Sequence, residues 1–339
     1  MKSPAATDPR NAMKSLIVLS AALLAGTALS QDAKTPAPAP VPVPPPPPVA
    51  AEIIVPTQAR TLMTFENGDF EEIFVDKATP TQFRYREQKQ SIDRKVKNLS
   101  EVAALYFYEP RAYKVARDHY QARRFSEARE LFAKIAAALK EIRELPNNHA
   151  TLSAFYELEC LRRMGDYEGL KVALEAFRKP GLTRQHHLDQ LELYILWEAV
   201  RTKGWPRLDA MCVERRKTAM PGYQRAQVAY CHGLALEGLD RPIEALNIYA
   251  TAITADYGAS QELVDMAAIN SLRLYSKDPE VKLAMKLWGT DDEDPNSSGR
   301  FRLEEAAALA DTYQSVLGGG KALPAQYKDL LKYKEKTEP

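Results

Sequence analysis

The spacing of apolar residues divides the chain into two parts of different texture. Between residues 57 and 108, short runs alternate apolar and polar positions, as in strands that bury one face. From Arg111 onward, alanine and leucine recur at intervals of three and four among charged residues, which is the spacing of amphipathic helices. The pattern therefore predicts a mostly α-helical protein with a small β module in front of the helices.

A hairpin is the clearest element of the β module. Thr61–Phe65 and Phe70–Val75 are β-prone runs, and the dipeptide Asn67-Gly68 separates them. Asparagine and glycine favour a tight hairpin because both turn residues must adopt positive φ. Three further strands are expected at 81–86, 91–96 and 104–108. Five short strands in about 50 residues favour a small five-stranded barrel over residues 57–110, since closure hides the strand edges.

This hairpin, the helical turn expected at 99–102 and the run Tyr106–Tyr108 together resemble the small Sm-like barrels of exported bacterial proteins. The resemblance covers about 50 residues and implies a closed barrel. Barrels of this kind often bind RNA, so the basic residues of the module are candidates for a binding surface. They are Arg84, Arg86, Lys89, Arg94, Lys95 and Lys97.

Two interpretations of this basic surface remain open. Phe83 and Tyr85 interleave with Arg84 and Arg86, and aromatic rings on a basic strand suit base stacking. In strict alternation, however, the aromatic rings face one side of the strand and the arginines face the other. A buried aromatic face and a solvated basic face are therefore favoured. We expect no nucleic-acid partner.

The helical region contains units of similar design. The clearest spans Ala229–Ala252, with Gly233 on a first helix, a turn at Asp240-Arg241-Pro242, and Tyr249 on a second helix. A second unit places Ala116, Ala128 and Phe132 in corresponding positions. In each unit, small residues allow two helices to approach and a larger residue fills the groove to the next unit.

These units resemble the tetratricopeptide repeat over residues 111–290. The turn Gly165-Asp166-Tyr167 also fits, although Leu170 stands where an alanine is expected, and the segments 191–215 and 261–288 fit poorly. The resemblance implies a right-handed α-solenoid of antiparallel helix pairs whose first helices line a groove for a peptide. The candidate groove residues are Tyr120, Tyr156, Arg163, Tyr194 and Tyr230. Residues 291–339 are expected to form an acidic loop and capping helices.

The first 56 residues are interpreted as an export signal followed by a proline-rich linker. An apolar run follows Met13-Lys14, and small residues at Ala28 and Ser30 fit a cleavage site, so residues 1–30 are interpreted as a signal peptide that starts at Met1 or at Met13. An uncleaved anchor is the alternative. Nine prolines then occur between Pro36 and Pro48. Residues 31–56 are expected to form an extended linker, either a spacer or a ligand for a proline-binding groove.

The composition of the chain excludes some classes of function but does not choose among the remaining ones. The 339 residues carry 46 basic and 45 acidic side chains, and this balance excludes a polycation that coats nucleic acid or an anionic membrane. The apolar run near the N-terminus is short for a membrane span, so none is expected in the mature chain.

No catalytic or metal-binding constellation stands out. His186 and His187 are adjacent and point in different directions on a helix, so they do not readily share a metal ion. Cys231 and His232 are adjacent too, and so are not an obvious nucleophile–base pair, which must lie within hydrogen-bond reach. Cys160 reads as a small buried residue, and so do Cys212 and Cys231, although an exported chain would allow those two to form a disulfide. We expect no enzyme, no metal and no cofactor.

Two functional hypotheses follow. The first is an exported, non-enzymatic scaffold in the periplasm or envelope of a bacterium, which binds a protein or peptide segment along the helical array. The second is a structural envelope protein whose basic β module contacts a wall or surface polymer.

Overall fold

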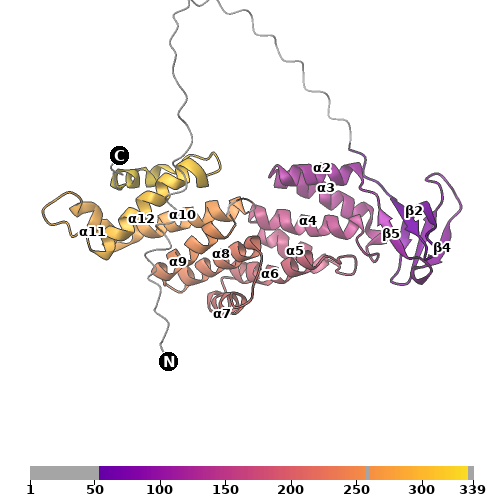
Figure 1. Ribbon diagram of the computed structural model, residues 1–339, viewed down its shortest axis with the longest axis horizontal. Helices are drawn as coiled ribbons and strands as arrows, with labels where there is room; N and C mark the ends of the chain where they lie inside the picture. Colours follow the sequence, from indigo (N-terminus) through magenta and orange to yellow (C-terminus); the bar gives the residue numbers. More distant parts are fainter. Residues whose placement is uncertain (1–52, 257, 259, 335–339) are drawn as a thin grey trace, which may run out of the picture. The chain divides into compact units, whose positions relative to one another are not determined.

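The computed structural model of the chain describes residues 53–256, 258 and 260–334 (Figure 1). The signal peptide expected at 1–30 and nearly all of the linker expected at 31–56 lie outside the described residues. The described chain is mostly helical and has one five-stranded antiparallel sheet near its start, which confirms the prediction of a mostly helical protein with a small β module.

Four of the five strands form where the alternating pattern predicted them, whereas the strand expected at 91–96 begins only at Lys95. Its strands are β1 (Ala59–Thr64), β2 (Phe70–Ala78), β3 (Gln82–Arg86), β4 (Lys95–Asn98) and β5 (Ala104–Phe107). They lie in the order β4-β3-β2-β1-β5, and a 3-10 turn, η2 (Leu99–Glu101), precedes β5. The predicted hairpin joins β1 to β2: Gly68 has a φ of 89°, and the backbone N–H of Phe65 donates to the Asp69 carbonyl over 3.0 Å.

The predicted barrel is wrong, because the sheet stays open with β4 and β5 as its edges. In the pairing of β4 with β3, Lys95 lies opposite Tyr85 and Lys97 lies opposite Phe83. The lysines therefore share the core-facing side of the sheet, and Val96 points outward with 62% of its surface exposed. Charged side chains on the inner side of a short edge strand oppose further pairing, which explains why this sheet does not close.

Helices occupy the rest of the described chain. The α-helices are α2 (Arg111–Gln121), α3 (Phe125–Ala138), α4 (His149–Met164), α5 (Tyr167–Ala176), α6 (Gln185–Arg201), α7 (Trp205–Arg215), α8 (Gly222–Gly238), α9 (Pro242–Ala255), α10 (Gln261–Lys277), α11 (Pro279–Leu287) and α12 (Ser298–Thr312). The shorter turns are η3 (Lys140–Ile142), η4 (Tyr313–Leu317), which is π-helical, and η5 (Ala325–Tyr333), which is 3-10. Within the described residues, no helix is both long and apolar enough to cross a membrane.

Helices that are neighbours in sequence pack against each other, and α6, α8, α10 and α12 also contact one another in turn. The small and large residues of the two clearest units meet as expected. A Cβ atom on Gly233 would lie only 2.3 Å from the ring of Tyr249, so α8 and α9 cross at a position that requires glycine. Ala116, Ala128 and Phe132 are fully buried between α2 and α3.

The sheet shares a hydrophobic core with the first helices. Met63, Ile73 and Phe83 from the inner face of the sheet belong to the same buried cluster as Phe132 and Ile135 of α3. A second cluster continues from α4 through the later helices to η5. The β module and the start of the helical region are therefore packed against each other and not merely linked.

Candidate functional site

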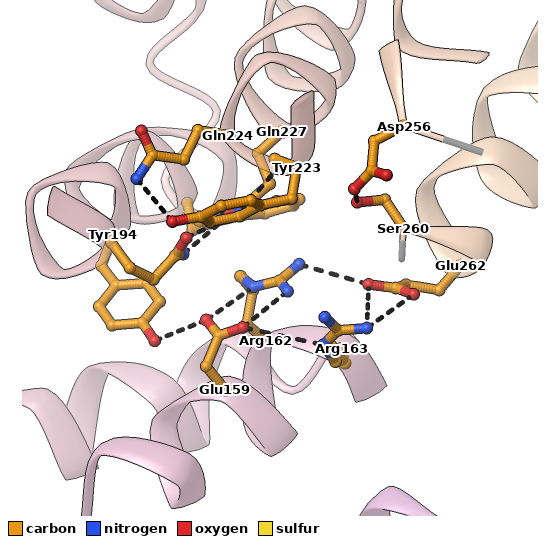
Figure 2. A network of polar contacts seen from close by, with 12 residues as sticks. Glu159, Arg162, Arg163, Tyr194, Tyr223, Gln224, Gln227, Asp256, Ser260 and Glu262 are labelled. Atoms are coloured by element: carbon orange, nitrogen blue, oxygen red, sulfur yellow. Dashed lines mark hydrogen bonds and ion pairs between the residues drawn. The ribbon is translucent and has the colours of Figure 1, made fainter. Parts of the chain in front are cut away.

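A buried network of charged and polar side chains joins three helices, and two of the predicted groove residues belong to it (Figure 2). Helix α4 contributes Glu159, Arg162 and Arg163, helix α6 contributes Tyr194, and helix α10 contributes Glu262. Arg162 donates from Nε and Nη2 to the two Glu159 oxygens over 3.1 and 2.9 Å. The hydroxyl of Tyr194 donates to Glu159 over 2.7 Å.

Glu262 connects this group to a distant part of the chain. Arg163 Nη1 lies 3.1 Å from the Glu262 carboxylate, and Arg162 Nη1 lies 3.7 Å from it. Arg163 and Glu262 are 99 residues apart in sequence. The pair of arginines therefore ties α4 directly to α10.

The local sequence of α4 explains how the charges gather. Glu159, Arg162 and Arg163 follow the three- and four-residue spacing that places side chains on one side of a helix. Their neighbours Leu158, Cys160 and Leu161 are almost fully buried. The group of charges inside an apolar helix is the signal in the sequence that points to this network. Of this group, only Arg163 was identified from the sequence.

Glu159 and Arg162 remain ionised at neutral pH. Burial by itself raises the pKa of Glu159, but Arg162, Arg163 and the Tyr194 hydroxyl together oppose it more strongly, and the pKa falls to about 2. Burial raises the pKa of Tyr194 well above its usual value, so its hydroxyl stays protonated and donates to Glu159. Two carboxylates balance two guanidiniums, which is the arrangement of a structural ion-pair network.

Buried amides extend the network toward α8. Gln190 and Gln227 exchange two hydrogen bonds of 2.9 Å, and the indole N–H of Trp197 donates to Gln227 over 3.1 Å. The ring of Trp197 lies 5.8 Å from the Arg162 guanidinium and stacks on Tyr230 at 6.1 Å. Gln190, Trp197 and Gln227 were not identified from the sequence, because isolated polar residues in apolar helices carry no local signal of their partners.

Three of the predicted groove residues form a half-buried surface beside the network. The Arg163 guanidinium lies 5.2 Å from the ring of Tyr120 and 5.5 Å from that of Phe125. Tyr156 meets Tyr120 edge-on at 5.3 Å. We call Tyr120, Phe125, Tyr156 and Arg163 the aromatic patch. Aromatic and arginine side chains are the types that dominate the energetics of protein interfaces.

The other two predicted groove residues are placed differently. Tyr194 and Tyr230 are almost completely buried. Both support the network from inside and offer no ring surface to a ligand. The five residues are thus brought together, but as a layer of core with an exposed margin and not as a continuous open groove.

The predicted basic surface of the β module separates into a cluster and scattered lysines. Arg84, Arg86 and Arg94 all contact the carboxylate of Asp76. The aromatic residues between them, Phe83 and Tyr85, are buried, as the alternation predicted.

The three lysines lie apart from this cluster. Lys95 pairs with Glu87, and Lys97 lies 4.7 Å from the ring of Phe65. Lys89 lies on an exposed loop.

The cysteines and histidines have structural surroundings. Cys160, Cys212 and Cys231 are buried free thiols, and burial raises the pKa of Cys160 and of Cys212 to about 12, so neither is a reactive thiolate. His232 Nε2 lies 2.8 Å from Asp209, and its Nδ1 lies 3.3 Å from an Arg216 nitrogen that can only donate. Both ring nitrogens are therefore occupied.

His187 is buried, whereas its neighbour His186 is exposed. In the described part of the chain, no three ligand-type side chains are grouped as a metal site would require.

No protein-family model matches the chain, and comparisons with curated proteins and with solved structures give no match.

Proposed function

We propose that this protein is an exported, non-enzymatic scaffold whose helical region is a right-handed solenoid similar to tetratricopeptide repeats and binds a protein or peptide segment. The observation that carries the proposal is the contact of Arg162 and Arg163 on α4 with Glu262 on α10, with the aromatic patch at its margin. The buried ion pairs fix α4, which carries Tyr156 and Arg163 of the patch, and a preordered surface loses less entropy on binding.

The chemistry of the patch favours a segment with apolar or aromatic side chains. Tyr120, Phe125 and Tyr156 are partly exposed, and the exposed side chain of Met164 lies next to Arg163 on the same helix end. Rings and a methionine offer contact area with few directional demands.

In-cell photocrosslinking tests this proposal. A photoreactive residue at Met164 leaves the patch itself intact, and the matched control carries the same residue at Val172, an exposed position of α5. We expect Met164 to capture one protein reproducibly, Val172 to capture none, and Tyr120→Ala to lower the yield from Met164 several-fold. Equal capture from both positions, or crosslinks only between copies of the chain, would overturn the proposal.

A second candidate function has its own supporting observation, the arginine cluster around Asp76. In this reading the protein is structural and its β module contacts an anionic polymer of the envelope. The test is co-sedimentation of the full chain with isolated wall material. Retention that falls with added salt and falls in Arg94→Gln would support it, because screened charge–charge contacts behave this way. Retention that changes neither with added salt nor in Arg94→Gln would contradict this second function.

A further inference from the structure

A β-bulge leaves one acidic side chain on the solvent face of β2 without a paired residue on β3. Val75 pairs with Tyr85 and Lys77 pairs with Arg84, so Asp76 is the extra residue between them. Bulges of this kind commonly redirect a side chain next to a binding site. The Asp76 carboxylate, only 9% exposed, meets the arginines of the neighbouring strand and loop.

Asp76 holds two of the three arginines by the same atom of each guanidinium. Arg84 Nε lies 2.7 Å from one carboxylate oxygen, and Arg94 Nε lies 3.5 Å from the other. In the described part of the chain, Asp76 is the only carboxylate that contacts either arginine. Among the described residues, no hydrogen bond joins an Nη group of either arginine to a carboxylate, and their side chains are 37% and 50% exposed.

Arg86 completes the cluster from a more buried position. Its Nη2 lies 3.4 Å from Asp76, and its Nη1 donates to the Ser91 carbonyl over 3.1 Å, which fixes the loop that carries Arg94. Its Nε is buried and makes no hydrogen bond. The cluster thus has three positive charges, one negative charge and unused donors.

Neighbouring carboxylates do not cancel this excess. Glu87 is engaged by Lys95 on the inner side of the sheet. Asp93 precedes Arg94 on the exposed loop, and no contact among the described residues joins its carboxylate to the cluster. Two unbalanced charges therefore remain at one place on the outer face.

We propose that Arg84, Arg86 and Arg94 form a binding site for the dianionic phosphate group of a phosphomonoester, with Asp76 as the positioning residue. A phosphomonoester carries a charge of about −1.5 to −2 at pH 7, close to the excess of the cluster. Its three terminal oxygens suit the paired N–H donors that guanidinium groups present.

The source of the phosphate is free inorganic phosphate or a monoester on a larger molecule. Ile92 and Val96 lie exposed beside the cluster, on the loop and on the strand opposite Arg84. Apolar surface next to the arginines favours an attached organic group over the free ion. The biological use of the site rests on the second candidate function, which the site narrows to a polymer that carries phosphomonoesters.

Calorimetric titration of the full chain at low salt tests the site itself. The probes are inorganic phosphate and glucose 6-phosphate, and the variants are Arg94→Gln and Arg84→Gln, with Lys95→Gln as the matched loss of charge outside the cluster. We expect saturable binding at one site, tighter for glucose 6-phosphate, that weakens at least tenfold in both arginine variants and less than twofold in Lys95→Gln. No saturable binding, or equal weakening in all three variants, would overturn the proposal.

The pH dependence separates the dianion from general anion attraction. The second ionisation of a phosphomonoester has a pKa of about 6, whereas guanidinium groups do not titrate in this range. Binding of glucose 6-phosphate should therefore strengthen several-fold between pH 5 and pH 7, and glucose 6-sulfate, a monoanion throughout, should bind weakly and without this change. Equal behaviour of the two esters would contradict the assignment.

A last arm distinguishes failure of the site from failure of the polymer function. Wall material is mixed with the full chain before and after phosphatase treatment. Loss of retention after treatment supports both the site and the polymer function. Binding of glucose 6-phosphate without retention on the wall leaves the site intact and overturns the polymer function. Retention that survives phosphatase overturns the polymer phosphomonoester as the ligand.

Discussion

Glu159 and Arg162 illustrate how a charged pair is tolerated inside a helical core. Burial disfavours both charges, and two hydrogen bonds between them, together with the Tyr194 hydroxyl, offset that cost. Removing one partner leaves the other charge buried without its strongest contact. Glu262, at 3.7 Å from Arg162, replaces only part of it.

We therefore predict that Glu159→Gln lowers the free energy of unfolding by about 3 kcal/mol at pH 7. The folded-state pKa of Glu159 is about 2, below the usual value for a free glutamate. Its contribution is thus fully present above about pH 4.5 and is lost as the pH falls toward 2. Urea denaturation from pH 7 down to pH 3 should show the difference between the two proteins shrinking as the pH falls.

Glu168→Gln is the control for this prediction. Glu168 pairs with Arg201 at the surface, and its side chain is 75% exposed. Surface ion pairs of this kind contribute under about 1 kcal/mol, so the control should change the free energy of unfolding little. A similar loss in both variants would show that the Glu159 network contributes no more than a surface pair.

At the scale of elements, the crossing of α8 and α9 depends on the absence of a side chain at one position. Gly233 lies directly against the fully buried ring of Tyr249. The Tyr249 hydroxyl donates to Glu237 over 2.6 Å, so the ring has little freedom to move aside. The sequence pattern identified this small–large contact because its two residues lie on neighbouring helices of one unit.

Gly233→Ala should destabilise the protein by about 1–3 kcal/mol, since overpacking a closely packed contact forces the helices apart. Thermal unfolding followed by circular dichroism provides the measurement. Gly204→Ala is the comparison, because a Cβ atom there would meet nothing closer than 3.6 Å. If Gly233→Ala unfolds at the temperature of the original protein, the crossing is looser than these contacts require.

At the scale of the whole molecule, the sequence pattern changes from strand-like to helical at residue 110, but the hydrophobic core continues across this boundary. Inner residues of the sheet and of α3 share one hydrophobic cluster. Lys77 of β2 also lies 4.0 Å from Glu141 of η3. The helical region is therefore stabilised by a sheet that sequence pattern alone would treat as a separate module.

A fragment of residues 111–339 should consequently unfold several degrees below a fragment of residues 52–339. It should also bind a hydrophobic dye that the longer fragment excludes, because removing the sheet exposes the apolar side of α3. Differential scanning calorimetry and dye fluorescence measure the two effects. Identical melting of the two fragments would show that the shared cluster contributes nothing to the stability of the helices.

The sequence by itself determined the local elements of this protein. Alternation predicted the strands, Asn67-Gly68 predicted the hairpin, and periodic alanine and leucine predicted the helices, because each of these signals depends on residues within one or two turns of the chain. The same local logic correctly assigned Phe83 and Tyr85 to the core.

Only the tertiary structure decided which of these elements meet. It left the sheet open at β4, buried Tyr194 and Tyr230, and joined Arg163 to Glu262 across 99 residues of sequence. Such contacts depend on how successive helices and strands stack, and the accumulated rotation from one element to the next is not encoded at any single position. The residues of the candidate site were therefore partly visible in the sequence, whereas their burial and their partners were not.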